Sequence, residues 1–287
     1  MHNDDLGCNW FLDATHENPE SGCSSTVNRP IHKVGAAGWT GGFRPKSNAK
    51  ITLFCFPYAG GTSLIYRNWP KVVPDLIDVC PVDLPGRGRR IHEEPFKCVE
   101  NLVEAAGDAL LPYIDRPYAL FGHSMGALIS FQVARRYRKQ GRQMPAHLFV
   151  SGCRAPHIPD PDPPTYNLPD AEFIEELRRL NGTPPDVLEH AELIQLMMPL
   201  LRADFEVCQT YRYEEESPLE CPITAFGGLQ DEDITKPQVE AWGTQTTVPL
   251  IARMIPGDHF FLNAQEPIII NVVARDLCRI AVGAVSQ

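Results

Sequence analysis

One serine of the sequence lies in a context typical of a nucleophile. Ser124 is the centre of the run Gly122-His123-Ser124-Met125-Gly126, which has the form G-x-S-x-G. The run follows an apolar stretch with strand character and precedes an amphipathic stretch, as a nucleophile elbow requires. In such a turn the hydroxyl projects from the end of the strand, and the N-terminus of the next helix favours developing negative charge. We therefore predict that Ser124 is a nucleophile; the alternative is a glycine-rich turn with a capping serine.

A serine nucleophile needs a base and an acid that orients the base. His259 lies just after the last apolar run, where α/β-hydrolases carry their histidine, in the chain order serine, acid, histidine. His123 is next to the serine, and we expect it to pack or to form a local hydrogen bond. Three acids follow the penultimate run. We predict Asp231 as the partner of His259, with Asp233 as the second choice and Glu232 as the third.

The negative oxygen that forms when a serine attacks a carbonyl needs two N–H donors. The residue after the nucleophile, Met125, supplies one of them in α/β-hydrolases, and the loop after the first core strand supplies the other. That loop is residues 56–61, Phe-Pro-Tyr-Ala-Gly-Gly, and its glycines permit close approach of the backbone to a substrate. We predict Ala59 as the second donor, with Tyr58 as the alternative; the remaining alternative is a plain turn.

Short apolar runs alternate with amphipathic stretches from residue 51 onward. Strands are predicted at 51–56, 79–84, 118–122, 147–151, 223–226 and 250–255, and helices at 99–114, 125–140 and 265–281. Runs that are short, apolar and closed by Gly, Pro or Asp are typical of buried parallel strands. The alternation predicts an α/β fold, with a mostly parallel sheet and helices on both faces.

Two segments depart from this alternation. Residues 1–47 are rich in Asn, Gly, Ser and Thr and lack periodicity, so we predict a flexible extension there, followed by one domain over residues 48–287. Residues 156–213 begin with a proline-rich stretch and continue with two helical stretches, around 170–181 and 190–213. We interpret this segment as a helical lid over an acyl chain; the alternative is an ordinary pair of buried crossover helices.

Composition excludes several other classes of function. The formal net charge of −10 argues against nonspecific nucleic-acid binding. The sequence has no apolar run of membrane-spanning length and no signal peptide, so a cytoplasmic protein is expected. Nine cysteines without a C-x-x-C pair indicate neither a disulfide framework nor a zinc site. Neither G-x-G-x-x-G, a P-loop nor H-E-x-x-H occurs, so no cofactor and no metal are expected.

Further motifs in the same order give the chain a resemblance to a known family. They are FPYAGG at 56–61, LPGRG at 84–88, GHSMG at 122–126, LRAD at 201–204, the run from Gly227-Gly228 to Asp231, and GDHF at 257–260. The chain resembles type II thioesterases, the free-standing editing enzymes of polyketide and nonribosomal peptide synthesis, and the medium-chain thioesterase of fatty-acid synthesis. LPGRG is the discriminating motif. Tyr58 departs from the family, many members of which carry His there.

The resemblance implies an α/β-hydrolase fold with a helical lid and the triad Ser124, Asp231 and His259. It also implies hydrolysis of acyl groups from the phosphopantetheine arm of an acyl or peptidyl carrier protein. A monomer is expected by default. A carboxylesterase or lipase acting on free small esters is the alternative. Carrier proteins are usually acidic, so docking would need a basic patch. The candidates are one cluster at Arg135, Arg136, Arg138, Lys139 and Arg142 and another at Arg87, Arg89 and Arg90. The alternative for the first cluster is that it is solvated and complements a helix C-terminus.

Overall fold

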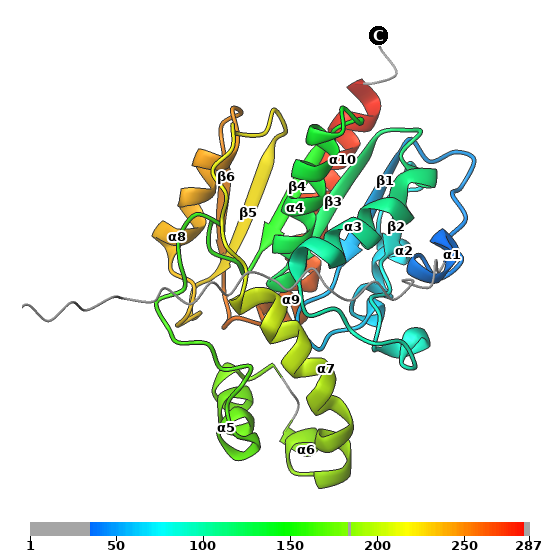
Figure 1. Cartoon of the computed structure of the whole chain (residues 1–287). Helices are drawn as coiled ribbons and strands as arrows, with labels where there is room; N and C mark the ends of the chain where they lie inside the picture. Colours follow the sequence, from blue (N-terminus) through cyan, green and yellow to red (C-terminus); the bar gives the residue numbers. More distant parts are fainter. Residues whose placement is uncertain (1–34, 183–184, 284–287) are drawn as a thin grey trace, which may run out of the picture. The chain divides into compact units, whose positions relative to one another are not determined.

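The computed structural model describes residues 35–182 and 185–283. Within them, six parallel strands form one sheet in the order β2-β1-β3-β4-β5-β6 (Figure 1). The strands are β1 (Ile51–Phe56), β2 (Ile77–Pro81), β3 (Tyr118–His123), β4 (His147–Ser151), β5 (Ile223–Gly228) and β6 (Ile251–Ile255). Every residue of β1, β3, β4 and β5 is buried, which explains why these strands are mostly apolar and do not alternate between apolar and polar residues.

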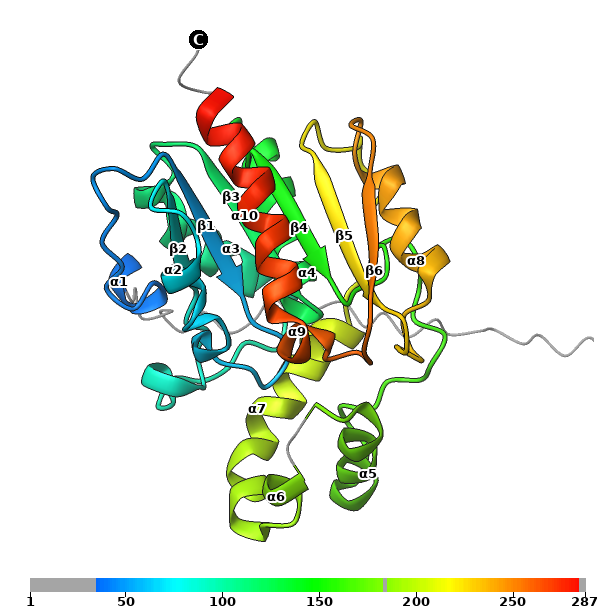
Figure 2. The same ribbon diagram turned by 180° about the vertical axis from the view of Figure 1, so that it is seen from behind.

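Helices cover both faces of the sheet. The helices are α1 (Ala36–Trp39), α2 (Trp69–Val72), α3 (Val99–Leu110), α4 (Met125–Lys139), α5 (Asp170–Leu180), α6 (Pro185–Leu188), α7 (Ala191–Gln209), α8 (Lys236–Glu240), α9 (Phe261–Ala264) and α10 (Glu266–Gly283). Helices α3, α4 and α8 lie on one face, and α10 crosses the other (Figures 1 and 2). A separate apolar core fills each side, one around Phe131 and Trp242 and the other around Trp69 and Phe121.

The predicted α/β fold and the predicted strands agree with this architecture. β1 and β4 coincide with their predicted ranges, whereas β2 begins and ends earlier than the predicted 79–84. Strand pairing stops at Pro81, opposite Cys55, although the buried apolar stretch continues to Leu84. Apolar composition indicates which residues are buried, not which are paired in a sheet. Here burial extends beyond the paired strand into the LPGRG loop, so the predicted range ended too late.

Part of the predicted N-terminal extension belongs to the folded unit. Residues 1–34 lie outside the described residues, but 36–39 form α1, and Trp39 is only 3% exposed. The guanidinium of Arg90 lies 4.3 Å from the centre of the Trp39 ring, and the N–H of Asp83 donates to the Trp39 carbonyl. The predicted domain start at residue 48 is therefore too late, because one buried indole fixes a segment whose glycine-rich composition resembles a linker.

The segment predicted as a lid contains α5, α6 and α7, between β4 and β5. These helices lie beyond the carboxyl ends of the strands, as both views show (Figures 1 and 2). They have a small apolar core of their own, which includes Phe173, Leu177 and Ile194. The same edge of the sheet carries the loops after β1, β3, β5 and β6. No helix in residues 35–182 or 185–283 combines the length and apolarity needed to span a membrane.

Candidate active site

The turn at Ser124 has the backbone conformation of a strained elbow. Ser124 has φ 52° and ψ −117°, a combination that residues other than glycine rarely adopt. Its N–H donates to the Ser151 carbonyl over 2.7 Å, and its own carbonyl accepts from the N–H of Ala127 over 2.9 Å. The central strand β3 and the first turn of α4 therefore hold the strain in place. The hydroxyl stands at the carboxyl edge of the sheet.

The two glycines of the G-x-S-x-G run are required by close backbone contacts. A Cβ at Gly122 would lie 1.9 Å from the carbonyl oxygen of Gly126, across the turn. A Cβ at Gly126 would lie 2.2 Å from the carbonyl oxygen of Phe56, at the end of β1. Both distances are far below van der Waals contact. The glycines thus allow α4 to start immediately after β3 and against the loop that follows β1.

His259 and Asp231 meet across the ends of β5 and β6. His259 Nδ1 lies 2.8 Å from Asp231 Oδ2, and the Asp231 carboxylate is fully buried. Burial raises the pKa of Asp231, but hydrogen bonds from His259 and from two backbone N–H groups outweigh burial and hold that pKa below its usual value. Asp233 instead pairs with Arg179 at 2.9 Å, and Glu232 is exposed. Of the three candidate acids, Asp231, the first choice, is therefore the one that contacts His259.

His123 forms a hydrogen bond with the backbone of the loop that carries His259. Its ring is fully buried, and its Nε2 lies 2.9 Å from the carbonyl oxygen of His259. A carbonyl can only accept, so Nε2 carries the proton and Nδ1 accepts from the Ser151 hydroxyl, also at 2.9 Å. Burial, with a contribution from His259, lowers the pKa of His123 to about 3, so the ring is neutral. His123 is buried and packs, as one of the two expectations had it, but its hydrogen bonds are not local, because they reach residues 28 and 136 positions away.

The loop after β1 lies beside the elbow. The N–H of Gly61 donates to the carbonyl of Tyr58 over 2.9 Å, which closes a tight turn around Ala59 and Gly60. The amides of Ala59 and Met125, the two predicted donors, form no hydrogen bond with any residue in the described ranges. Both residues line the same cavity as Ser124 and His259. Two N–H groups of this kind beside Ser124 would suit an oxyanion.

A cavity of about 570 Å³ opens at Ser124 and extends beneath α5 and α7. Apolar and aromatic side chains line much of it, among them Leu128, Phe205, Tyr213 and Trp242. Cys153 also lines it, but burial raises the pKa of this thiol to about 12, so it remains protonated and is a poor nucleophile. No cluster of metal-ligating side chains occurs within the described part of the chain.

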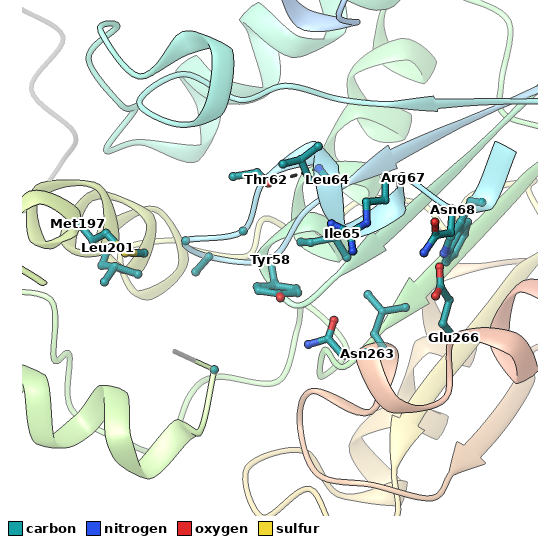
Figure 3. Close-up of a pocket in the computed structure, with 16 residues that line it drawn as sticks. Tyr58, Thr62, Leu64, Ile65, Arg67, Asn68, Met197, Leu201, Asn263 and Glu266 are labelled. Carbon is teal, nitrogen blue, oxygen red and sulfur yellow. Dashed lines mark hydrogen bonds between the residues drawn. The ribbon is translucent and has the colours of Figure 1, made fainter. Parts of the chain in front are cut away.

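A second cavity, of about 450 Å³, is lined in part by the loop after β1 (Figure 3). It shares Tyr58, Ala59, Gly182 and Leu201 with the first cavity. Its walls are more polar. Thr62, Arg67, Asn68, Asn263 and Glu266 line it, while Met197 and Leu201 of α7 approach from one end. The loop that carries the Ala59 amide thus borders both an apolar and a polar cavity.

LPGRG and LRAD carry part of the family resemblance, but no common role for their charged residues follows from the sequence. In the structure Arg87 and Asp204 form a bidentate ion pair, with both hydrogen bonds 2.7 Å long. Both side chains are almost fully buried. A buried arginine and a buried aspartate need partners of opposite charge. That need is the feature that could have indicated an ion pair between them. Their separation of 117 residues concealed which partner each one has.

The two basic clusters considered for carrier docking are largely paired within the molecule. Arg135, Arg138 and Lys139 all contact Glu216, and Arg136 contacts Asp108. The second cluster is likewise engaged: Arg87 pairs with Asp204, Arg89 with Asp83 and Arg90 with Glu93. Of these cations, only Arg142 forms no ion pair with another described residue. Neither cluster therefore offers the row of free cations that would attract an acidic partner.

Known proteins with similar sequences include thioesterases and a gramicidin S biosynthesis protein. The model of the thioesterase domain family matches residues 51–277. The chain belongs to the thioesterase family. The gramicidin S biosynthesis protein GrsT of Aneurinibacillus migulanus is 46% identical over 231 residues, which cover 80% of this thioesterase and 90% of GrsT. The linear gramicidin dehydrogenase LgrE of Brevibacillus parabrevis is 44% identical over 253 residues, covering 87% and 96%.

Solved structures agree as well. The thioesterase RedJ from the prodiginine biosynthetic pathway of Streptomyces coelicolor is 41% identical and superimposes with a TM-score of 0.75, covering 81% of this thioesterase and 87% of RedJ. The resemblance to type II thioesterases and the α/β-hydrolase fold that it implied are thereby confirmed. The enzyme is a serine hydrolase of the thioesterase class.

Proposed function

We propose that this thioesterase hydrolyses acyl groups from the phosphopantetheine arm of acyl or peptidyl carrier proteins, with Ser124, His259 and Asp231 as its triad. The observation that carries the proposal is the 2.8 Å hydrogen bond between Asp231 and His259, in a cavity that Ser124 and His259 both line. Because His259 directs Nδ1 to the carboxylate, its Nε2 is the nitrogen available to accept a proton.

The proposed reaction has two halves. Ser124 Oγ attacks the thioester carbonyl while His259 takes the hydroxyl proton, and the N–H groups of Ala59 and Met125 stabilise the oxyanion. The C–S bond breaks, and the departing sulfur receives the proton, which leaves an acyl-serine. A water molecule, deprotonated by His259, then attacks the acyl-serine. The tetrahedral intermediate that forms then collapses, which returns the proton from His259 to Ser124 and releases the free acid. Asp231 remains ionised throughout and stabilises the imidazolium.

The two cavities suit the two ends of such a substrate. The acyl chain would occupy the apolar cavity of about 570 Å³, with α5 to α7 as its lid. The amide-bearing arm would follow the more polar cavity, where Asn68 and Asn263 offer hydrogen bonds. GrsT and RedJ are described as biosynthetic proteins, which supports an editing role in such a pathway. The name of LgrE includes dehydrogenase, but this sequence contains no G-x-G-x-x-G run.

The test is to load a panel of acyl groups onto carrier proteins and to follow release of free acid by mass spectrometry, with Ser124→Ala as the blank. We expect hydrolysis by the native chain and a loss of at least about 1,000-fold in Ser124→Ala. Matched oxygen esters of the same acids are the comparison. Faster turnover of the oxygen esters would favour the carboxylesterase alternative, and full activity of Ser124→Ala would overturn the triad.

A further inference from the structure

The loop that bears the Ala59 amide is held from two directions. Within α7, Leu200, Leu201 and Asp204 lie on one face, because they are spaced by three and four residues. A Cβ at Gly60, where φ is +73°, would lie 2.6 Å from the Leu201 side chain. A Cβ at Gly86, in LPGRG, would lie 3.2 Å from Leu200. Helix α7 thus packs directly against both the loop after β1 and the loop after β2.

Arg87 and Asp204 complete this junction with hydrogen bonds. The Asp204 carboxylate accepts from the N–H of Gly60 over 2.7 Å, in addition to its two bonds from Arg87. Arg87 also donates to the carbonyl of Gly61 over 3.3 Å and to that of Pro85 over 3.2 Å. The two residues that follow Ala59 are therefore each bound by one member of the ion pair. The pair is 5% and 2% exposed, so little water competes for these bonds.

We propose that the Arg87–Asp204 pair positions the Ala59 amide as an oxyanion donor, and that Arg87 also neutralises the carboxylate beside it. The inference rests on the function proposed above. An oxyanion donor contributes only if its N–H is aimed at the place where charge develops. An unpaired carboxylate bonded to the next amide along the chain would oppose that charge. Arg87 and Asp204 are thus positioning residues, and neither of them touches the reacting atoms.

The test compares variants of the pair under steady-state conditions. Arg87→Met removes both the hydrogen bonds and the neutralising charge, and we expect kcat to fall by about 100-fold with KM changed less than about threefold. Arg87→Lys keeps the charge and loses the bidentate geometry, so partial rescue is expected. Asp204→Asn keeps an acceptor for Gly60 without the negative charge, and we expect the smallest loss, about 10-fold.

Arg90→Met is the matched control. Arg90 lies three residues from Arg87, is also buried and bonds Glu93 through two nitrogens, but it contacts Trp39 and the Asp83 carbonyl instead of the loop after β1. Both Met variants should lower Tm, because each removes a buried arginine from a charge-assisted pair, although Glu93 is partly exposed and Asp204 is not. Only Arg87→Met should lower kcat per folded molecule.

A second readout separates positioning from general stability. An acyl trifluoromethyl ketone forms a tetrahedral adduct with Ser124 and needs the oxyanion donors, whereas an acyl-pantetheine thioether does not. We expect the Ki of the ketone to rise in parallel with the loss of kcat, and the Kd of the thioether to stay unchanged. Normal kcat and normal ketone binding in folded Arg87→Lys and Asp204→Asn would overturn the inference, even if Arg87→Met did not fold. If those variants are normal while Ser124→Ala is inactive, only the positioning role fails; an active Ser124→Ala removes the proposed function itself.

Discussion

His123 Nε2 donates a hydrogen bond to the backbone carbonyl of His259 over 2.9 Å, so a buried neutral imidazole supports the loop of the proposed base. The two rings also meet, with centres 5.5 Å apart. The side chain next to the proposed nucleophile thus points away from the substrate cavity and fixes the loop that crosses above it.

This burial predicts a pH dependence of stability. The pKa of His123 is about 3 in the folded protein and about 6.5 in an unfolded chain. Between these values the unfolded chain binds a proton that the folded protein excludes. The free energy of unfolding should therefore fall as pH falls through this window, by up to about 1.4 kcal/mol per pH unit from this group. Urea unfolding at pH 7.5, 6 and 5 would measure the slope.

His123→Gln should flatten that slope, whatever its effect on stability at pH 7.5. His147, whose pKa burial lowers to about 4, contributes to the same slope and remains in the variant. The control is His92→Gln, because His92 is exposed. An unchanged slope in His123→Gln would mean that the folded protein accepts the proton on His123.

The choice between Asp231 and Asp233 can be tested directly. Asp231→Asn should lower kcat by about 1,000- to 10,000-fold, because an amide does not stabilise the imidazolium and can hold the wrong tautomer of His259. Asp233→Asn should change kcat less than about threefold, since Asp233 bonds Arg179 and not the histidine. Carrier-thioester hydrolysis with purified variants is the measurement. Equal losses in the two variants would contradict the assignment.

The elbow predicts a steric effect at Gly126. In Gly126→Ala the new methyl group would lie 2.2 Å from the Phe56 carbonyl, and backbone rather than a flexible side chain must move. We expect a loss of about 2 to 3 kcal/mol in the free energy of unfolding and a marked loss of activity. Gly243→Ala, whose Cβ would have no neighbour nearer than 3.7 Å, is the control and should change stability by less than about 0.5 kcal/mol.

The cluster around Glu216 predicts a loss of stability without a loss of carrier recognition. Burial raises the pKa of Glu216, but Lys139, Arg135 and Arg138 outweigh burial and hold it below the usual value. The stabilisation is therefore present at neutral pH and is lost as pH falls through that lowered pKa. Glu216→Gln should cost about 2 kcal/mol at pH 7, because Arg135 is buried.

Chemical denaturation measures the free energy of unfolding of Glu216→Gln. Glu240→Gln is the control, because Glu240 forms an exposed pair with Lys236 that contributes little to stability. KM for a carrier-bound substrate should remain within about twofold in both variants. A large change of KM in Glu216→Gln would reinstate this cluster as a docking surface.

The sequence by itself determined the local features. These features depend only on residues that are close together in the chain. They include the strand–turn–helix order around Ser124, the apolar runs and their breaks, and the positions of Asp231 and His259 at strand ends. Parallel strands place their carboxyl ends at one edge, so the candidate site follows from these local patterns. The boundary of β2 and the docking of Trp39 did not follow, because composition does not distinguish paired from merely buried residues.

Only the tertiary structure decided which distant charges meet. Arg87 and Asp204 are separated by 117 residues, and His259 selects one carboxylate of three that lie within three residues of each other. The same holds for Glu216, which pairs with the basic cluster that the sequence offered as a candidate docking patch. Ion pairing depends on separations of a few ångströms in space, and distance along the chain carries no information about them once the chain has folded.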